Sequence, residues 1–259
     1  MTGALWVSKT GLGAQDTALR TIANNLANVG TVGFKKDRVV FEDLVYQIQQ
    51  QPGAANSQDA NLPSGVQLGA GVRVASTQKH FSIGTMQTTE QPLDLAVQGR
   101  GFFQVTLPDG SLAYTRTGSF TQNENGDVVT AQGYQLEPGI NIPNGTDSVS
   151  IGRDGTVTAT SQGASTQIGN LQLVDFINPT GLESAGGNLY LETVASGAPL
   201  QTTPGLNGAG EVVQGMLESS NVSVVEEMVN MVSTQRAYEM NARVVSTSDQ
   251  MLQYLVQNV

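Results

Sequence analysis

The chain has 259 residues and a formal net charge of −10, although only 13% of its residues are charged. The acidic excess lies in residues 46–221, which carry fourteen acidic and five basic side chains, and this balance argues against nucleic acid as a partner. Cysteine is absent, which excludes a disulfide framework, a thiolate nucleophile and a cysteine metal site. The low charge and the 30 glycines favour a β-rich secreted or self-assembling protein over a cytosolic enzyme.

The N-terminal residues lack the features of a cleaved secretory signal, because they contain neither a basic start nor a continuous apolar run. No segment approaches the roughly 18 apolar residues of a membrane-spanning helix. We therefore expect a protein that is not membrane-embedded. If it leaves the cytoplasm, it is exported without a cleaved signal peptide.

A helix is predicted over residues 2–29, where Gly30 offers a left-handed stop. A 3-4 spacing places one narrow seam along it. Gly11 and Gly13 lie in its interior and each costs about 1 kcal/mol relative to alanine, so we expect the helix to need a partner surface. The seam positions are Leu5, Ser8, Leu12, Gln15, Leu19, Ile22, Leu26 and Val29.

The next segments are less regular. Residues 39–48 are apolar and predict either a strand or a short helix. Residues 49–65 predict a long loop, which is usually either functional or a flexible linker. The loop positions that we single out are Gln51, Pro52, Gly53, Leu62, Pro63 and Gly65.

From residue 66 to about residue 215 no helical period is present. Turn signals at Asp109-Gly110, Asn125-Gly126 and Asp154-Gly155 each lie beside apolar or β-branched residues and predict hairpins. Residues 101–107 and 114–117 form the expected strand pair around the first of these turns. This region is therefore predicted to be all-β.

A second long helix is predicted after residue 221, with Ser220 or Asn221 as its cap. It also carries a seam, and two seams at opposite ends of a chain can close on each other when the middle returns near its start. The second seam consists of Val224, Met228, Met231, Gln235, Tyr238, Ala242, Val245, Asp249, Leu252 and Val256.

The expected fold class is α+β, with the terminal helices paired as a coiled coil and a mainly antiparallel β central domain. The expected domains are residues 1–35 plus 222–259 for the helices, 36–65 for a connecting segment and loop, and 66–221 for the outer β-domain. Apolar side chains outside the seam, such as Val225, Val232 and Leu255, are expected to pack on neighbouring subunits. The polar seam residues Ser8, Gln15, Gln235 and Asp249 either fix register or are simply exposed.

Catalytic patterns are weak. His80 is the only histidine, and a lone histidine is more often a surface or satisfied residue than a catalytic one. Residues 76–79 match S-x-x-K and residues 9–11 match K-T-G, but their order is reversed and no S-D-N element accompanies them. No phosphate-binding glycine loop is present. We predict no enzyme activity, no metal and no cofactor.

Two motifs at opposite ends carry the most information. At the first, three asparagines close to a helix end could be no more than capping and solvated amides. That segment nevertheless resembles the N-N-L-A-N and G-[FY]-K signature of the bacterial flagellar axial family of rod, hook and hook-associated proteins. The far end, from residue 220 to residue 252, resembles the C-terminal helix of the same family. The matching positions are Asn24, Asn25, Leu26, Ala27, Asn28, Gly33, Phe34 and Lys35, and then Gln235, Arg236, Ala237 and Tyr238.

Within this family the likeness covers essentially the whole chain and is greatest to the distal-rod branch. Gly30 stands where a serine is common, and the residues of the 49–65 loop differ in detail. The resemblance implies a homo-oligomeric helical tube with the helices innermost, which transmits torque and encloses the export channel. It also implies that the 49–65 segment makes an extra contact that stiffens the rod.

The implied partners are proximal rod and hook proteins, the surrounding basal-body rings and the flagellar type III export apparatus. The implied location is the flagellar basal body, where it crosses the periplasm. A proximal-rod or hook-type subunit is the alternative within the family. A monomeric secreted adhesin, whose helices form only a stalk, is the alternative outside it.

Overall fold

A computed structural model describes residues 2–51, 55–57, 60–61 and 64–257. The chain divides into two compact units. The helical unit contains Met1–Leu26, Asp37–Gln78 and Ser223–Val259, and the β-unit contains Ala27–Lys36 and Lys79–Val222. The α+β class and the antiparallel central region are confirmed. Residues 66–78, which the sequence analysis grouped with the β-domain, lie in the helical unit.

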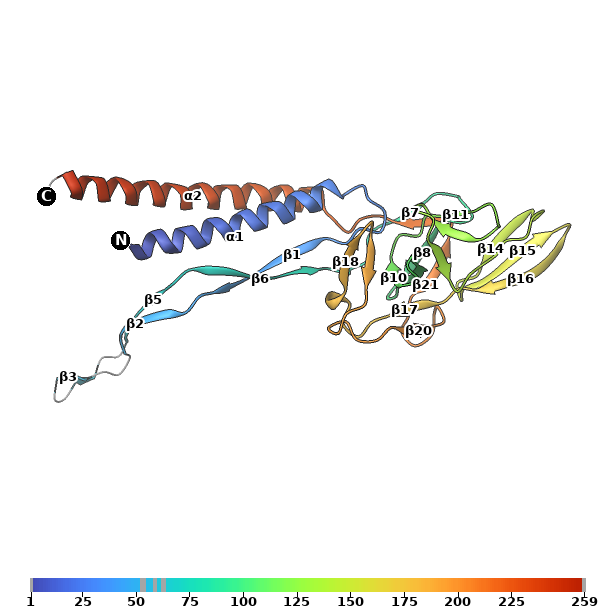
Figure 1. Ribbon diagram of the computed structural model, residues 1–259, viewed down its shortest axis with the longest axis horizontal. Helices are drawn as coiled ribbons and strands as arrows, with labels where there is room; N and C mark the ends of the chain where they lie inside the picture. Colours follow the sequence, from blue (N-terminus) through green and yellow to red (C-terminus); the bar gives the residue numbers. More distant parts are fainter. Residues whose placement is uncertain (1, 52–54, 58–59, 62–63, 258–259) are drawn as a thin grey trace. The chain divides into compact units, whose positions relative to one another are not determined.

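Two long helices dominate the helical unit. Helix α1 spans Thr2–Ala27 and helix α2 spans Val224–Gln257, and they run antiparallel beside each other (Figure 1). They come close at Gly11, where an added Cβ would lie 3.0 Å from Nδ2 of Asn241. Neither helix contains, in its described residues, a stretch apolar enough to cross a bilayer.

The cap of α2 differs from the sequence prediction. Ser223, rather than Ser220 or Asn221, precedes the helix, and its Oγ lies 3.5 Å from the backbone N–H of Glu226. The backbone N–H of Glu227 donates to the Ser223 carbonyl at 3.0 Å. Glu226 and Glu227 also place negative charge at the positive end of the helix dipole.

Strands complete the helical unit. Strand β1 (Asp37–Asp43) lies beside β6 (Val72–Lys79), and β2 (Tyr46–Gln50) pairs antiparallel with β5 (Val66–Gly69). The segment for which a strand or a short helix was predicted is therefore β-structure. Strands β3 (Ala55–Ser57) and β4 (Ala60–Asn61) pair within the segment predicted to be a loop, while Pro52, Gly53, Leu62 and Pro63 lie outside the described residues.

A seven-stranded sheet forms the centre of the β-unit, with the order β11-β12-β13-β9-β10-β19-β18. The predicted hairpins at Asp109-Gly110 and Asn125-Gly126 are confirmed, because the first joins β9 to β10 and the second joins β11 to β12. The strands are β9 (Phe103–Thr106), β10 (Leu112–Thr115), β11 (Phe120–Gln122), β12 (Val128–Thr130), β13 (Gln135–Glu137), β18 (Glu183–Gly186) and β19 (Leu189–Leu191).

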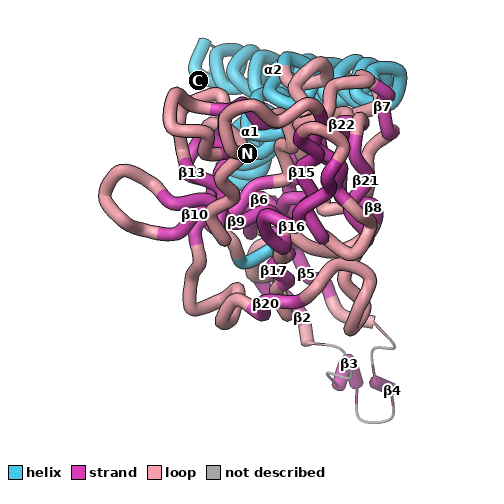
Figure 2. The backbone as a smooth tube through the Cα atoms, turned by 90° about the vertical axis from the view of Figure 1, so that its right-hand side faces the viewer, coloured by secondary structure: helices cyan, strands magenta, loops and turns pink. Residues whose placement is uncertain are grey.

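Smaller antiparallel sheets surround this one, and turns and loops connect them (Figure 2). The third predicted hairpin, at Asp154-Gly155, is also confirmed, because it joins β14 (Ser148–Ile151) to β15 (Thr156–Ser161), which also pairs with β16 (Ala164–Asn170). The remaining elements are the pairs β8 (Leu95–Gln98) with β21 (Glu211–Gln214), β7 (Met86–Thr88) with β22 (Met216–Glu218), and β17 (Leu173–Asp175) with β20 (Leu200–Thr202), and the short 3-10 helix η1 (Pro179–Gly181).

The β-unit has two hydrophobic clusters. The larger one includes Leu95, Phe103 and Val212, from three different strands, and its members are almost fully buried. The smaller one is aromatic, with Phe102, Phe176 and Tyr190 in edge-to-face contacts that stabilise beyond simple burial. The β-unit therefore has a core of its own.

Candidate functional site

The first family motif ends in a backbone conformation that requires glycine. Gly33 has φ +71°, and an added Cβ would lie 2.7 Å from the backbone nitrogen of Thr117 and 2.8 Å from the backbone carbonyl carbon of Arg116. Its N–H donates to the carbonyl of Glu218 at 2.8 Å. The left-handed residue after α1 is thus Gly33, whereas Gly30, which was expected to fill that role, does not have positive φ.

The lysine of the motif forms a buried ion pair. Nζ of Lys35 lies 2.6 Å from Oε1 of Glu218, and neither side chain is reached by solvent. The same ammonium donates to the Ser82 carbonyl at 2.7 Å, and Oε1 also accepts from the N–H of Gly84 at 2.8 Å. Glu218 closes β22, so this contact joins the segment after α1 to the segment before α2.

A second cation shares this carboxylate. Nη1 of Arg116 lies 3.7 Å from Oε2 of Glu218, and the guanidinium donates to the carbonyls of Val97 and Gly99. Burial lowers the pKa of the Lys35 ammonium below its ordinary value, while the Glu218 charge and hydrogen bond oppose this shift. Because all three side chains are buried, we assign the cluster a structural role.

The other motif residues have distinct local roles. Asn25 is buried, and its amide accepts from the N–H of Asp37 and donates to the Asp37 carbonyl, both at 2.9 Å. The simple view of solvated amides is therefore wrong for Asn25. Phe34 is buried under the Lys79 ammonium, 5.3 Å from its ring centre. Asn24 and Ala27 are exposed and Leu26 is half-buried.

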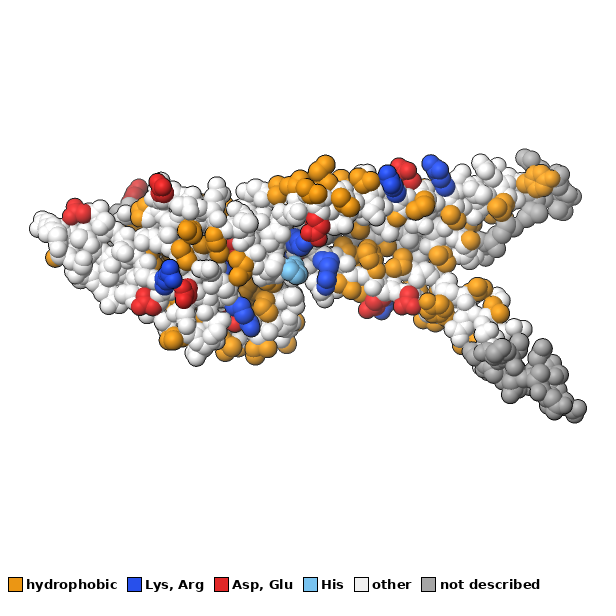
Figure 3. All heavy atoms as spheres, turned by 180° about the vertical axis from the view of Figure 1, so that it is seen from behind, with side chains coloured by type: hydrophobic (Ala, Val, Ile, Leu, Met, Phe, Trp, Pro, Cys, Tyr) orange, Lys and Arg blue, Asp and Glu red, His pale blue; other side chains and the backbone are white. Residues whose placement is uncertain are grey.

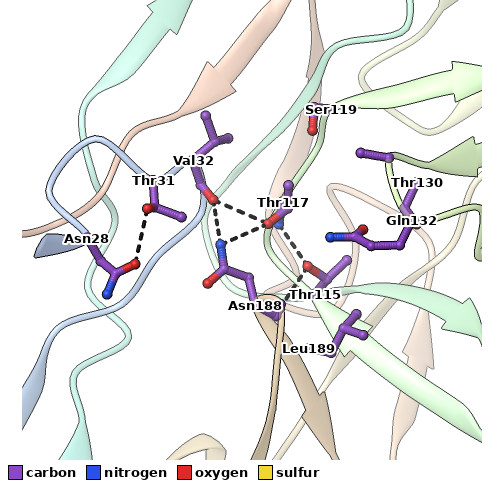
Figure 4. Close-up of a pocket in the computed structure, with 12 residues that line it drawn as sticks. Asn28, Thr31, Val32, Thr115, Thr117, Ser119, Thr130, Gln132, Asn188 and Leu189 are labelled. Carbon is purple, nitrogen blue, oxygen red and sulfur yellow. Dashed lines mark hydrogen bonds between the residues drawn. The ribbon is translucent and has the colours of Figure 1, made fainter. Parts of the chain in front are cut away.

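Asn28 borders a small pocket of about 330 Å³ in the β-unit (Figure 4). Its carboxamide oxygen accepts from the Thr31 hydroxyl at 3.1 Å, and Asn188 donates to the Val32 carbonyl at 2.9 Å. Most of the lining residues have a hydroxyl or carboxamide side chain, and none of the lining side chains is titratable. The pocket can therefore hold a neutral hydrogen-bonding group but cannot supply an acid or a base. Its lining is Asn28, Thr31, Val32, Thr115, Thr117, Ser119, Thr130, Ala131, Gln132, Gly187, Asn188 and Leu189.

The residues considered for catalysis in the sequence lie on different elements. His80 is exposed, with Nδ1 2.9 Å from the Ser82 hydroxyl. In the described part of the chain, no group of three histidine, aspartate or glutamate residues could hold a metal ion. The K-T-G residues 9–11 lie on α1, and Ser76 and Lys79 lie on β6.

The face that α1 buries is made mostly of small residues. Its buried positions are Ser8, Ala14, Ala18, Ile22 and Asn25. Two of these, Ser8 and Ile22, belong to the sequence-derived seam. The other seam positions are half-buried: Leu5, Leu12, Gln15, Leu19, Leu26 and Val29.

On α2 a partly covered stripe recurs every three or four residues, at Met231, Thr234, Ala237, Asn241, Val245, Ser248 and Leu252. Of the sequence-derived seam, the stripe includes Met231, Val245 and Leu252. The exposed members of that seam are Val224, Met228, Gln235, Tyr238, Ala242 and Asp249, and Arg236 beside them is exposed as well. The Val256 and Leu255 side chains lie outside the described part of the chain.

Large apolar side chains on the first turns of α2 are uncovered. Val225, Met228, Val229 and Val232 expose 73%, 55%, 63% and 48% of their surface, and we call them the α2 patch. At 100° per residue they centre on the side of α2 opposite the partly covered stripe. Figure 3 shows apolar side chains gathered on this helix. Val225 and Val232 are thus exposed, as the packing expectation requires.

The N-terminal turns of α1 line an apolar groove of about 830 Å³. Ala4, Trp6 and Val7 form its α1 side, and Leu68 and Ala70 lie on the strand side. The ammonium of Lys9 lies 5.5 Å from the centre of the Trp6 ring. We call this the N-terminal groove. The described strands β2 and β5 are exposed along their full length.

Comparison with known protein families gives matches at both ends of the chain and in its middle. The family model "Flagella basal body rod protein" matches residues 5–35, "Flagellar hook protein FlgE/F/G D1 domain" matches residues 96–159, and "Flagellar basal body rod FlgEFG protein C-terminal" matches residues 213–258. The first and last of these ranges contain the two motifs.

Relatives named flagellar basal-body rod protein FlgG match over nearly the whole chain. The protein from Buchnera aphidicola subsp. Schizaphis graminum (strain Sg) is 56% identical, covering 99% of this chain and 100% of the relative. Those from Caulobacter vibrioides (strain ATCC 19089 / CIP 103742 / CB 15) and Bacillus subtilis (strain 168) are 44% and 38% identical, covering 96% and 99% of this chain and 97% and 98% of the relatives.

Two terminal helices that carry the family motifs, joined to an antiparallel β-unit, define a structural subunit. The chain belongs to the flagellar basal-body rod protein family, and the resemblance stated from the motifs is confirmed. As a member of this family it is a structural protein of the flagellar basal body.

Proposed function

We propose that this chain is the subunit of the distal rod, and that its copies polymerise into a rigid helical tube. The tube transmits torque from the motor to the hook and encloses the export channel. Near-complete coverage of the rod relatives supports a rod subunit over a hook-type subunit or an adhesin. Proximal rod and hook proteins, the basal-body rings and the type III export apparatus are its proposed partners.

The observation that carries assembly is the α2 patch. Four large apolar side chains, none more than about half buried, lie on one face of a helix. Contiguous exposed apolar surface of this kind marks interaction sites on soluble proteins. Copies of the same chain are the partners that a rod subunit meets most often, so we assign the patch to contacts between copies.

The paired helices form the proposed inner layer of the tube. Gly11 lies beside Asn241, and the seam leucines at positions 5, 12 and 19 remain half-buried. In the proposed tube these leucines and the exposed Tyr238 and Met228 become covered. The second motif, from Gln235 to Tyr238, lies on this helix and contributes to the same layer.

The β2–β5 hairpin supports the proposed stiffening contact. Its described residues Tyr46, Ile48 and Leu68 each expose about half of their apolar side chains. Gln51 and Gly65 flank the tip of this hairpin. A contact between the hairpin and a neighbouring copy would resist bending. Deleting residues 51–65 should give filaments with a shorter persistence length, and unchanged stiffness would remove this role.

Assembly itself is tested with the purified full-length chain. Sedimentation and negative-stain imaging at rising concentration should show tubes, and Val232→Asp should prevent them because it places a charge in a contact between copies. Val194→Asp is the matched control, because Val194 is fully exposed but lies in the β-unit. A wild-type chain that remains monomeric at all concentrations would refute the proposal.

A further inference from the structure

Two apolar surfaces of the helical unit, the α2 patch and the N-terminal groove, are both uncovered in the single chain. We propose that the α2 patch of one copy docks into the N-terminal groove of a second copy, so that the chain polymerises head to tail. This inference rests on the proposed function and names the surfaces through which assembly occurs.

The groove suits an apolar helix face. Its volume of about 830 Å³ is bordered by Trp6, Val7 and Leu68, all of which are at least 40% exposed. None of the described residues that line it is charged. Gly3 and Gly69 also border it, and without side chains they allow close approach of a partner backbone. A helix that inserts there would bury apolar surface without stranding a charge.

The α2 patch suits the groove in turn. Its four side chains repeat at intervals of three and four residues, so they project from one side of the helix as a ridge about two turns long. Ridges of this spacing pack into grooves between neighbouring elements. Each of the four side chains is aliphatic or a thioether, so the ridge and the groove match in polarity.

Charge at the two surfaces is complementary. The exposed ammonium of Lys9 lies across the Trp6 ring at the groove. The exposed carboxylate of Glu226 follows Val225 at the start of the patch. Docking would bring a cation of one copy near an anion of the other, which favours this register over its reverse.

The positions of the two surfaces make the contact head to tail. In the antiparallel pair Gly11 lies beside Asn241, so Trp6 and Val229 lie on opposite sides of this point. They are separated along the helix axis by about 25 Å, at 1.5 Å per residue. The groove lies between α1 and the strands, whereas the patch lies on the side of α2 away from the partly covered stripe. Such a contact is heterologous and repeats without closing into a dimer.

Cross-linking between copies tests the contact directly, because the natural chain has no cysteine. Val229→Cys and Leu68→Cys chains are purified separately, mixed, assembled and treated with a short bismaleimide. Neighbouring thiols react at high effective concentration, so the yield of cross-linked dimer should exceed that of a control pair by about tenfold. The control pairs Val229→Cys with Val244→Cys, which is exposed on a different face of α2.

A charge exchange gives a second readout. Lys9→Glu and Glu226→Lys should each raise the critical concentration for assembly, and the double variant should return it toward the wild-type value. Val229→Asp, which places a charge inside the apolar contact, should raise the critical concentration on the order of tenfold or more. Circular dichroism of each monomer confirms that α1 and α2 still form.

The outcomes separate this inference from the proposed function. Wild-type tubes together with the enriched cross-link and the restored double variant support both. Tubes that form normally with no enrichment over the control pair, or a double variant no better than either single one, would overturn the docking while leaving the rod function intact. A wild-type chain that never assembles would overturn both.

Discussion

Nζ of Lys35 lies 2.6 Å from Oε1 of Glu218, across 183 residues of sequence and with neither side chain exposed to solvent. Arg116 approaches the other carboxylate oxygen at 3.7 Å, so one anion serves two cations. Removing the anion is therefore expected to do more harm than removing either cation.

Glu218→Gln should lower the free energy of unfolding of the β-unit by about 3–5 kcal/mol, because it leaves two buried cations without a counter-ion. Glutamine keeps the size of the glutamate side chain and one oxygen that accepts hydrogen bonds, so the lost free energy of unfolding measures the effect of the negative charge. Lys35→Met should cost less, since the carboxylate keeps Arg116. Urea denaturation followed by circular dichroism measures both.

Arg153→Met is the control for this series, because the Arg153–Glu211 pair is largely exposed. Exposed ion pairs contribute at most about 1 kcal/mol. A Glu218→Gln loss no larger than that of Arg153→Met would contradict a structural role for the buried cluster.

Gly33→Ala should destabilise the β-unit by at least about 1–2 kcal/mol, the cost of a left-handed backbone for a residue with a Cβ. The new methyl group would also press against the backbone at Arg116 and Thr117. Gly30→Ala, where the added Cβ has open space and φ is not positive, should be close to neutral. Equal thermal shifts for the two variants would show that the conformation of Gly33 is unimportant.

Gly13→Ala should stabilise α1 by up to about 1 kcal/mol, because alanine is the better helix former and nothing lies within 4 Å of the new Cβ. Gly11→Ala should give a smaller gain, since its Cβ would lie 3.0 Å from Nδ2 of Asn241. Amide hydrogen exchange along α1 measures the difference. A larger gain at Gly11 would mean that α1 and α2 do not approach each other at this point.

The hydroxyl and the backbone N–H of Ser111 hold the pKa of Asp109 below its usual value. A carboxylate whose pKa is lower in the folded chain than in the unfolded chain adds stability above the unfolded pKa and loses it as pH falls through the folded pKa. Ser111→Ala should therefore raise the Asp109 pKa, and the stability difference between the variant and the wild type should begin to shrink below about pH 4 and vanish once the pH is below the folded pKa. Carbon-detected NMR titration measures this.

Asp154 supplies the internal control for that titration. Hydrogen bonds from Thr156 lower its pKa by the same turn geometry, and Ser111 is not among its partners. Its pKa should stay unchanged in Ser111→Ala. A shift of both carboxyls together would point to a global change in the β-unit.

Local chemistry explains why some elements were predictable. Asp109-Gly110 and Asp154-Gly155 set their turns through neighbouring residues, so the hairpins follow from short sequence windows. The helix cap was equally local: Ser223 with Glu226 three residues on has the spacing of a capping box, a signal that outweighs Ser220 and Asn221.

Long-range relationships were not predictable in the same way. Nothing near Lys35 or Glu218 in sequence indicates the other, and the motif pointed to Lys35 only through family likeness. In the helix pair the 3-4 spacing predicted that large residues such as Leu12 and Tyr238 are covered. In the structure Ala14 and Ala18 are buried, Leu12 and Ala237 are half-buried and Tyr238 is exposed, so burial follows small residues more closely than the large residues of the heptad spacing.

Within the β-unit, Gly33 and Lys35, in the segment that follows α1, are both bonded to Glu218, in the segment that precedes α2. A tensile load applied through these two segments would therefore act directly on these few bonds. Breaking of these bonds, rather than separation of strands, would then set the force at which the β-unit begins to unfold.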